Sequence, residues 1–272
     1  MRACSFFLLS PVRGRGRVRG DAPTMLETQS LTIRFGGHAA VDGVSCAFEK
    51  GTLTSIVGPN GAGKTTYFNL ISGQLPATSG KVTLNGEDIT GYAAPRRTRL
   101  GLGRAFQLTN LFPNLSALEN VRLAVQVKSG KGYDLLSRTL THRELIDRAM
   151  AHLAAVSLAD RAQTVAATLP HGDQRKLEVA ILLALEPDVF MFDEPTAGMS
   201  IDEVPTVLDI IAAIKARGDK TILLVEHKMD VVRSLSDRIV VLHQGKLVAD
   251  GKPAEVIASD IVREAYLGGA NA

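Results

Sequence analysis

Nine residues near position 60 have the types and the spacing of a phosphate-binding loop. The segment GPNGAGKTT at residues 58–66 fits the pattern GxxxxGK[ST] and follows an apolar run, residues 53–57, that is typical of a buried strand. In such a loop, backbone N–H groups turn toward phosphate oxygens, Lys64 reaches the β- and γ-phosphates, and the Thr65 hydroxyl binds Mg²⁺. A glycine turn between a strand and a helix would account for the glycines but not for Lys64 and Thr65. The pattern predicts a nucleotide site formed by Gly58, Pro59, Asn60, Gly61, Ala62, Gly63, Lys64, Thr65 and Thr66.

Two acidic residues follow a second apolar run. Residues 189–192 read as a buried strand, and Asp193 and Glu194 come directly after it. In parallel sheets, ligands bind at the carboxyl ends of the strands. Asp193 therefore suits the Mg²⁺-associated acid of a Walker B motif, and Glu194 is placed to polarise an attacking water. The alternative is that both acids only cap the helix that follows.

Composition limits the class of protein. With 272 residues and 45% hydrophobic residues, the chain can form one large α/β domain or a core with a subdomain. Cys4 and Cys46 are the only cysteines and have no metal-ligand spacing, which favours a reducing compartment over a disulfide framework. No apolar run approaches the roughly 20 residues that span a bilayer. We therefore expect any membrane role to depend on a partner.

The net charge of +3 is concentrated in residues 1–24, which carry five arginines and one aspartate and hence a local +4. The remaining chain is at −1, which argues against a nucleic-acid partner. In this leading segment the apolar stretch precedes the basic one, the reverse of a secretory signal. We expect residues 1–24 to be a mis-called start or a disordered tail, with a nucleic-acid-binding arm as the alternative. The predicted domain is then 25–268, followed by a tail at 269–272.

The phosphate-binding loop and the hydrophobic patterning together predict an α/β fold of the P-loop NTPase class. Strands are expected at 31–34, 44–48 and 81–84, with a helix at 64–72, and residues 116–165 change to helical spacing. After Pro170 the pattern alternates between helices and strands, with helices at 174–185 and 204–216 and strands at 189–192 and 221–225. A hairpin at 238–250 and a short helix at 253–259 follow. The predicted architecture is a parallel sheet core, an amino-terminal antiparallel β subdomain, and an inserted α-helical subdomain at about 108–175.

From Leu26 to Leu267 the chain resembles the ATP-binding cassette (ABC) family of transporter ATPases. The family's motifs occur in its usual order, namely Walker A, Gln-loop, signature, Walker B and switch histidine. The resemblance implies that Phe35 stacks on adenine and that Gln107 lies near Mg²⁺ and the attacking water. It also implies that Glu194 is the catalytic carboxylate, that His227 contacts the γ-phosphate, and that ATP and Mg²⁺ are bound. Taken alone, Phe35 would be a core aromatic, Gln107 a loop amide and His227 a structural histidine.

The signature and the D-loop depart from the family pattern. In this family, two nucleotide-binding domains enclose two ATP molecules, and each signature completes the partner's site. The signature residues expected to face the partner's ATP are Pro170, His171, Gly172, Asp173 and Gln174, and Leu-Pro-His-Gly-Asp stands at 169–173 where LSGGQ is usual. Pro170 has neither a hydroxyl nor an N–H to offer. Asp173 can cap the helix that we expect to start there, yet a carboxylate near the triphosphate is repulsive. The D-loop reads Ala-Gly-Met-Ser at 197–200 in place of Ser-Ala-Leu-Asp.

Several segments look like the ATP-binding subunits of branched-chain amino acid importers, among them residues 34–37, 106–115, 119–121, 126–142, 172–178 and 265–268. This resemblance implies a second ATPase subunit, two membrane permeases, a periplasmic binding protein, and a peripheral position on the cytoplasmic side of the inner membrane. Urea and lipopolysaccharide transport ATPases share some of these segments. A soluble ABC ATPase without a permease and a subunit that binds ATP without hydrolysing it are further alternatives. The cargo cannot be identified from this chain, because the ATPase never touches it.

Overall fold

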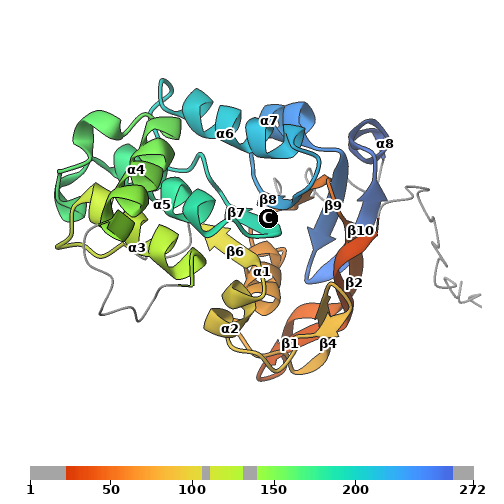
Figure 1. The fold of residues 1–272 in the computed structure, drawn as a ribbon. Helices are drawn as coiled ribbons and strands as arrows, with labels where there is room; N and C mark the ends of the chain where they lie inside the picture. Colours follow the sequence, from red (N-terminus) through yellow and green to blue (C-terminus); the bar gives the residue numbers. More distant parts are fainter. Residues whose placement is uncertain (1–22, 106–110, 131–139, 260–272) are drawn as a thin grey trace, which may run out of the picture.

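The structure is a computed structural model and describes residues 23–105, 111–130 and 140–259, of which 140–142 by their backbone alone. A six-stranded sheet in the order β10-β9-β3-β8-β7-β6 forms its centre (Figure 1). Strands β3, β6, β7, β8 and β9 run parallel to their neighbours, and β10 pairs with β9 in the antiparallel sense. The strands are β3 (Leu53–Val57), β6 (Leu102–Ala105), β7 (Val189–Asp193), β8 (Thr221–Val225), β9 (Arg238–His243) and β10 (Lys246–Gly251).

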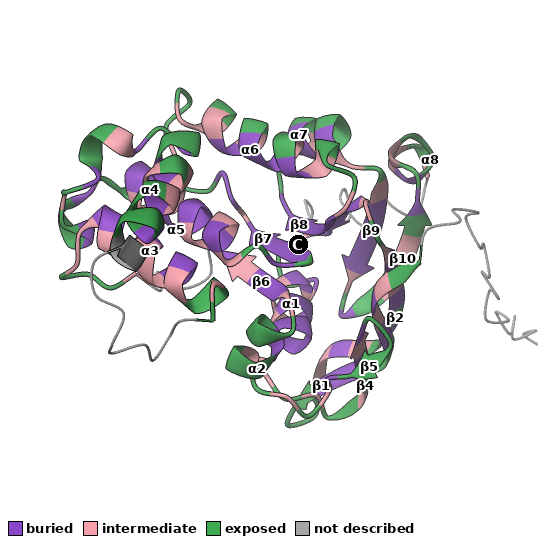
Figure 2. Ribbon diagram, viewed as in Figure 1, coloured by how far each residue is buried: buried purple, intermediate pink, exposed green. Residues whose placement is uncertain are grey.

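The central strands β3, β7 and β8 are buried at every position and mainly apolar, because both of their faces are covered. In β7, Val189 and Met191 belong to one hydrophobic cluster, whereas Phe190 and Phe192 belong to another. Successive side chains of a strand point to opposite faces, so each cluster occupies one side of the sheet. Figure 2 shows these strands buried between helices whose outer faces are exposed. The prediction of a parallel sheet from the strands at 189–192 and 221–225 is confirmed.

One face of the sheet is covered by α1 (Lys64–Ser72) and by a four-stranded antiparallel sheet. This second sheet has the order β2-β1-β4-β5, with β1 (Thr24–Phe35), β2 (His38–Glu49), β4 (Ser79–Leu84) and β5 (Glu87–Asp88). Tyr67 and Phe68 of α1 are fully buried in the cluster that the two sheets share. The amino-terminal antiparallel subdomain is thus confirmed, and its first strand begins at Thr24, one residue before the predicted domain start.

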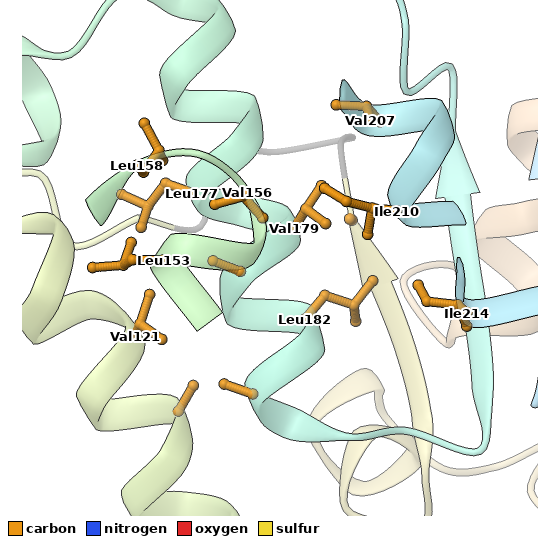
Figure 3. Close-up of a cluster of buried hydrophobic side chains, with 14 of the residues drawn as sticks. Val121, Leu153, Val156, Leu158, Leu177, Val179, Leu182, Val207, Ile210 and Ile214 are labelled. Atoms are coloured by element: carbon orange, nitrogen blue, oxygen red, sulfur yellow. The ribbon is translucent and has the colours of Figure 1, made fainter. Parts of the chain in front are cut away.

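The opposite face is covered by α6 (Val204–Ala216) and by α5 (His171–Leu185), which also packs against α3 (Ala117–Lys128) and α4 (Leu140–Ala155). Figure 3 shows Leu177 and Val121 in the helical part of this cluster, with Leu182 of α5 and Ile210 of α6 nearer the sheet. Because α5 belongs to both layers, it joins the helical subdomain to the core. The remaining helices are α2 (Ala94–Arg99), α7 (Met229–Leu235), α8 (Pro253–Ala258) and the 3₁₀ turns η1 (Ala159–Arg161) and η2 (Ala166–Thr168).

The start of α5 differs from the prediction. The helix begins at His171, three residues before the expected Gln174, because the Gln174 N–H already donates to the Pro170 carbonyl at 2.9 Å. The predicted cap by Asp173 is wrong for the same reason. Pro170 occupies the N-cap position, and Asp173 lies inside the first turn. In addition, β6, α2 and α7 were not predicted.

Candidate nucleotide-binding site

Neighbouring parallel strands bring the predicted site residues to one edge of the sheet. The loop of residues 58–63 follows β3, His227 follows β8, and Asp193 and Glu194 stand at the end of β7. These strands are adjacent in the order β3-β8-β7, so their carboxyl ends lie side by side. Gln107 would follow the next strand, β6, but it lies outside the described residues. The predicted Walker A and Walker B segments and the switch histidine are therefore neighbours in space.

The loop is built to bind an anion. Gly63, with φ 97°, is the N-cap of α1; no side chain caps the helix, and its first turn contains no acid. Lys64 is only 6% exposed, and its Nζ donates to the carbonyl oxygens of Gly58 at 2.7 Å and Pro59 at 3.0 Å. Burial lowers the pKa of the Lys64 ammonium, an effect that Glu194 and Asp193 oppose. The helix end and a held ammonium are the two features that a triphosphate requires.

Gly63 and Gly61 offer a matched test of this loop. A Cβ on Gly63 would lie 2.4 Å from the backbone oxygen of Ala40, whereas a Cβ on Gly61 (φ 77°) meets nothing within 4 Å. We expect Gly63→Ala to destabilise the fold by about 2–4 kcal/mol, through strain plus collision, and Gly61→Ala by about 1 kcal/mol, through strain alone. Urea unfolding of both variants checks this. Equal losses would show that the contact with Ala40 does not constrain the loop.

Glu194 and His227 form a hydrogen-bonded pair across two strands. The Nε2 of His227 lies 2.7 Å from Oε1 of Glu194, and both side chains are more than one-third exposed. Glu194 has a positive φ of 52°, an uncommon conformation for this residue type, and its N–H donates to the Val225 carbonyl at 2.9 Å. The strained backbone turns this carboxylate away from the strand, while β8 holds it in place.

Glu226 fixes the backbone beneath this pair. It is 3% exposed, its Oε1 accepts from the Thr196 hydroxyl at 2.7 Å, and its Oε2 accepts from the His227 N–H at 3.0 Å. One buried carboxylate thus joins the turn after β7 to the turn after β8. Sequence reasoning treated Glu226 only as the end of a strand, and its acidic type at that position was the one available signal.

Asp193 is held by an arginine to which sequence reasoning gave no role. Arg104, at the end of β6, donates from Nη2 to Oδ2 of Asp193 at 2.7 Å, and from Nη1 to Asn69 at 2.7 Å and to Ser72 at 2.8 Å. The side chains of Arg104 and Asp193 are 6% and 5% exposed. Burial raises the pKa of the Asp193 carboxyl, and Arg104 opposes that rise. Arg104 therefore links α1, β6 and β7.

Phe35 is 54% exposed at the end of β1, which is not the environment of a core aromatic. It pairs with His38 at the hairpin whose next strand places Ala40 against Gly63. The ring is thus free to stack on a base beside the phosphate loop. Thr65 and Thr66 lie in the first turn of α1 and are half-buried. The individual roles of these residues stay predictions.

A family model described as "ABC transporter" matches residues 41–197, which is more than half of the chain. The chain belongs to the ABC transporter family. A second model, described as a branched-chain amino acid ATP-binding cassette transporter, matches residues 246–272. This ABC protein is therefore an ATP-binding and ATP-hydrolysing subunit of a transporter, as the sequence predicted. In the part of the chain that the structure describes, none of the helices has both the length and the apolarity to cross a membrane.

The cassette is similar to curated transport proteins along nearly all of their length. It is 38% identical to the high-affinity branched-chain amino acid transport ATP-binding protein LivG of Salmonella typhimurium and 39% identical to BraF of Pseudomonas aeruginosa, in each case covering 90% of this chain and 98% of the relative. It is also 33% identical to the arginine/ornithine transport ATP-binding protein AotP of Pseudomonas aeruginosa, covering 86% of this chain and 93% of that one.

The fold is also similar to solved cassettes, which confirms the predicted P-loop NTPase class. The ADP conformation of MJ1267, an ATP-binding cassette of an ABC transporter, matches with a TM-score of 0.75 and 28% identity over 90% of this chain and 99% of that chain. The dimeric post-hydrolysis state of the cassette MJ0796, bound to ADP and Pi, matches with a TM-score of 0.73 and 26% identity over 84% and 99%.

The signature acid of this cassette is paired with two cations. Oδ2 of Asp173 accepts from Arg161 of η1, and Oδ1 accepts from Lys176 of α5 at 3.1 Å. Lys176 also lies 3.6 Å from Glu203, whose Oε2 accepts from the D-loop residue Ser200 at 3.0 Å. The expected repulsion between Asp173 and phosphate is therefore reduced within this subunit. The same network joins the signature helix to the D-loop.

The unfolding free energy of the protein is expected to depend on pH through Glu178 of α5. Burial raises the pKa of its carboxyl from 4.5 to about 7, and Arg175 opposes this rise. Since the folded state keeps a proton that the unfolded chain releases above pH 4.5, stability falls as the pH rises from 4.5 to 7. We expect the unfolding free energy to drop by about 2 kcal/mol between about pH 5 and pH 8 relative to Glu178→Gln. Urea unfolding at both pH values measures this, and an equal change of the unfolding free energy with pH in wild type and Glu178→Gln would contradict it.

Proposed function

We propose that this ABC ATPase powers the import of branched-chain amino acids, from the cytoplasmic side of the membrane and with two permeases and a periplasmic binding protein. Two observations support the cargo. The curated relatives LivG and BraF are named for branched-chain amino acid transport, and a family model of that description matches residues 246–272. The similarity to AotP, named for arginine and ornithine, makes basic amino acids the cargo to test against.

The proposed mechanism of ATP hydrolysis is supported by one observation. Adjacent strands bring together Lys64, Asp193, Glu194 and His227 at their carboxyl ends. Lys64 and the amino end of α1 bind the β- and γ-phosphates of ATP, and Phe35 stacks on the adenine. Thr65, Asp193 and Gln107 would hold Mg²⁺, and the ion would neutralise the charge that develops on the phosphates during cleavage. Glu194 accepts a proton from the attacking water, and His227 holds that water and the γ-phosphate in line.

Transport follows from a cycle of dimer closure and opening. Two cassettes enclose two ATP molecules, each bound by one subunit's phosphate loop and by the signature of the other, residues 170–174 here. Loss of the γ-phosphate removes the negative charge that both faces neutralise, and the dimer opens. The similar cassette MJ0796 is dimeric in a post-hydrolysis state bound to ADP and Pi, which supports this cycle. A groove beside the Gln-loop passes the movement to the permeases.

Uptake measurements in the native host test the cargo. We expect deletion of the gene to abolish high-affinity uptake of labelled leucine, isoleucine and valine, the wild-type gene to restore it, and the Lys64→Ala gene to fail. Arginine, urea and lipopolysaccharide transport serve as controls. Unchanged leucine uptake in the deletion strain together with loss of one of the control cargoes would replace the proposed substrate by that cargo.

A further inference from the structure

Glu226 lies beneath the pair of Glu194 and His227 and bridges two turns. Its side chain is buried, and both of its oxygens accept hydrogen bonds. Oε1 accepts from the Thr196 hydroxyl at 2.7 Å and from the Thr196 N–H at 3.3 Å. Oε2 accepts from the N–H groups of His227 at 3.0 Å and Lys228 at 3.4 Å. The donors on the two sides therefore come from the turn after β7 and the turn after β8.

The donors around Glu226 explain why an acid occupies this buried position. Each oxygen faces at least one backbone N–H, which can only donate. Glutamine has a single acceptor oxygen, so in either orientation its amide group would face the N–H of one of the two turns. A buried donor that loses its acceptor is costly. A carboxylate is thus the group that holds both turns at once.

The contact between Glu194 and His227 depends on this backbone arrangement. The two side chains are 38% and 43% exposed, so neither is enclosed by packing, yet Oε1 and Nε2 lie 2.7 Å apart. The Glu194 carbonyl accepts from the Ala197 N–H at 3.1 Å, which closes the turn that contains Thr196. Through Thr196, Glu226 attaches this turn to the backbone of His227. The separation of the two turns therefore sets where the imidazole stands relative to the carboxylate.

We propose that Glu226 is a positioning residue for ATP hydrolysis, whose carboxylate sets the separation of the two turns and thereby places His227 against Glu194. The inference rests on the proposed hydrolytic roles of these two residues. Glu226 is itself buried and acts through His227, without contact with the nucleotide. Loss of either half of the bridge is then expected to slow hydrolysis and to leave ATP binding unchanged.

The first experiment compares Thr196→Val with Thr196→Ser in the full-length chain, within the complex reconstituted with its permeases. Valine resembles threonine in shape but cannot donate to Oε1 of Glu226, whereas serine can. We expect kcat to fall about tenfold in Thr196→Val and to stay within about twofold of wild type in Thr196→Ser, because a small misplacement of reacting groups lowers the rate strongly. KM for ATP is expected to be unchanged in both. Equal kcat values in the two variants would overturn the proposal.

Thr221→Val is the matched control for stability. Thr221 begins β8, the strand that leads to Glu226, and is fully buried with its hydroxyl donating to the Glu49 carbonyl at 3.2 Å. It thus loses a comparable hydrogen bond at the opposite end of the strand. We expect the melting temperature to fall by about 2–4 °C in both valine variants, and kcat to fall only in Thr196→Val. An equal loss of kcat in both would show that stability, and not position, governs the rate.

The second experiment tests whether Glu226 acts through His227. Glu226→Gln is made in the wild type and in the His227→Ala variant, and kcat is measured in all four proteins. A residue that positions the imidazole has little to position once that ring is removed. We expect Glu226→Gln to lower kcat about tenfold or more in the wild type and less than about twofold beside His227→Ala. Equal factors in the two backgrounds would contradict the inference, since a purely structural role gives that result.

The failure of this inference is distinguishable from failure of the proposed function. Wild-type hydrolysis rates in Glu194→Gln and His227→Ala would contradict the proposed mechanism itself. Slow hydrolysis in those two variants, together with unchanged kcat in Thr196→Val and Glu226→Gln, contradicts only the role of Glu226.

Discussion

Glu194→Gln is expected to reduce the ATP hydrolysis rate by about 100-fold or more, because general-base catalysis contributes roughly 10²–10⁴ in rate. Glutamine has nearly the same shape as glutamate, so its carbonyl still accepts the hydrogen bond from His227, 2.7 Å away in the wild type. Its amide cannot accept a proton from water. ATP affinity is expected to stay within a few-fold of wild type, since Lys64 and the loop are unchanged. Phosphate release and fluorescent-nucleotide binding measure the two effects separately.

His227→Ala is the companion variant for this test. It removes the group that hydrogen-bonds Glu194 and leaves the carboxylate in place, so we expect a smaller loss than in Glu194→Gln. Hydrolysis by Glu194→Gln at the wild-type rate would show that this subunit's site does not use the carboxylate as a base. A common loss of nucleotide binding in both variants would instead point to a structural role for the pair.

Arg104→Met is expected to cause the largest loss of stability among single substitutions at the site. It leaves Asp193 buried without its cationic partner, and the removal of one member of a buried pair costs about 3–5 kcal/mol. The variant also removes the hydrogen bonds to Asn69 and Ser72. Asp193, whose pKa burial already raises, then loses the charge that opposes that rise. Urea unfolding at neutral pH measures the change.

Arg122→Met is a matched control for this prediction. Arg122 of α3 lies 2.9 Å from Glu119 one turn earlier, but Glu119 is 41% exposed. Solvated pairs of this kind contribute about 1 kcal/mol or less. The double variant Arg104→Met with Asp193→Asn is expected to recover part of the loss, because no charge is then buried alone. A cost for Arg104→Met no greater than that for Arg122→Met would show that Asp193 is stable without its partner.

Strongly periodic elements were predictable from the sequence. The helices at 64–72 and 204–216 and the strands at 53–57 and 221–225 have the predicted bounds, because burial on one or both faces imposes a clear pattern on each. The helix α2 has no such pattern. It depends on Arg97, which is 2% exposed and donates to the carbonyls of Leu70 and Ile71, far away in the sequence. Long-range contacts of this kind leave no local signal.

The same distinction applies to the site. Lys64, Asp193 and Glu194 belong to contiguous motifs, so their place at one edge of the sheet could be predicted from the sequence. Arg104 and Glu226 could not be assigned in this way, because their partners come from other strands; Arg104 and Asp193 are 89 positions apart. Glu226 bonds to Thr196, 30 positions earlier. Only the strand order brings such residues together.

Arg97 of α2 holds the carboxyl end of α1, the helix whose amino end carries Lys64. Its Nη1 binds the last carbonyls of α1, the helix whose first turn carries Lys64, while its Nη2 binds the Thr90 carbonyl at 2.8 Å. The carboxyl end of α1 is thus held in place by α2. Helix α2 also lines a pocket beside β6. The position of Lys64 at the front of α1 therefore depends on how firmly α2, through Arg97, holds the carboxyl end of the same helix.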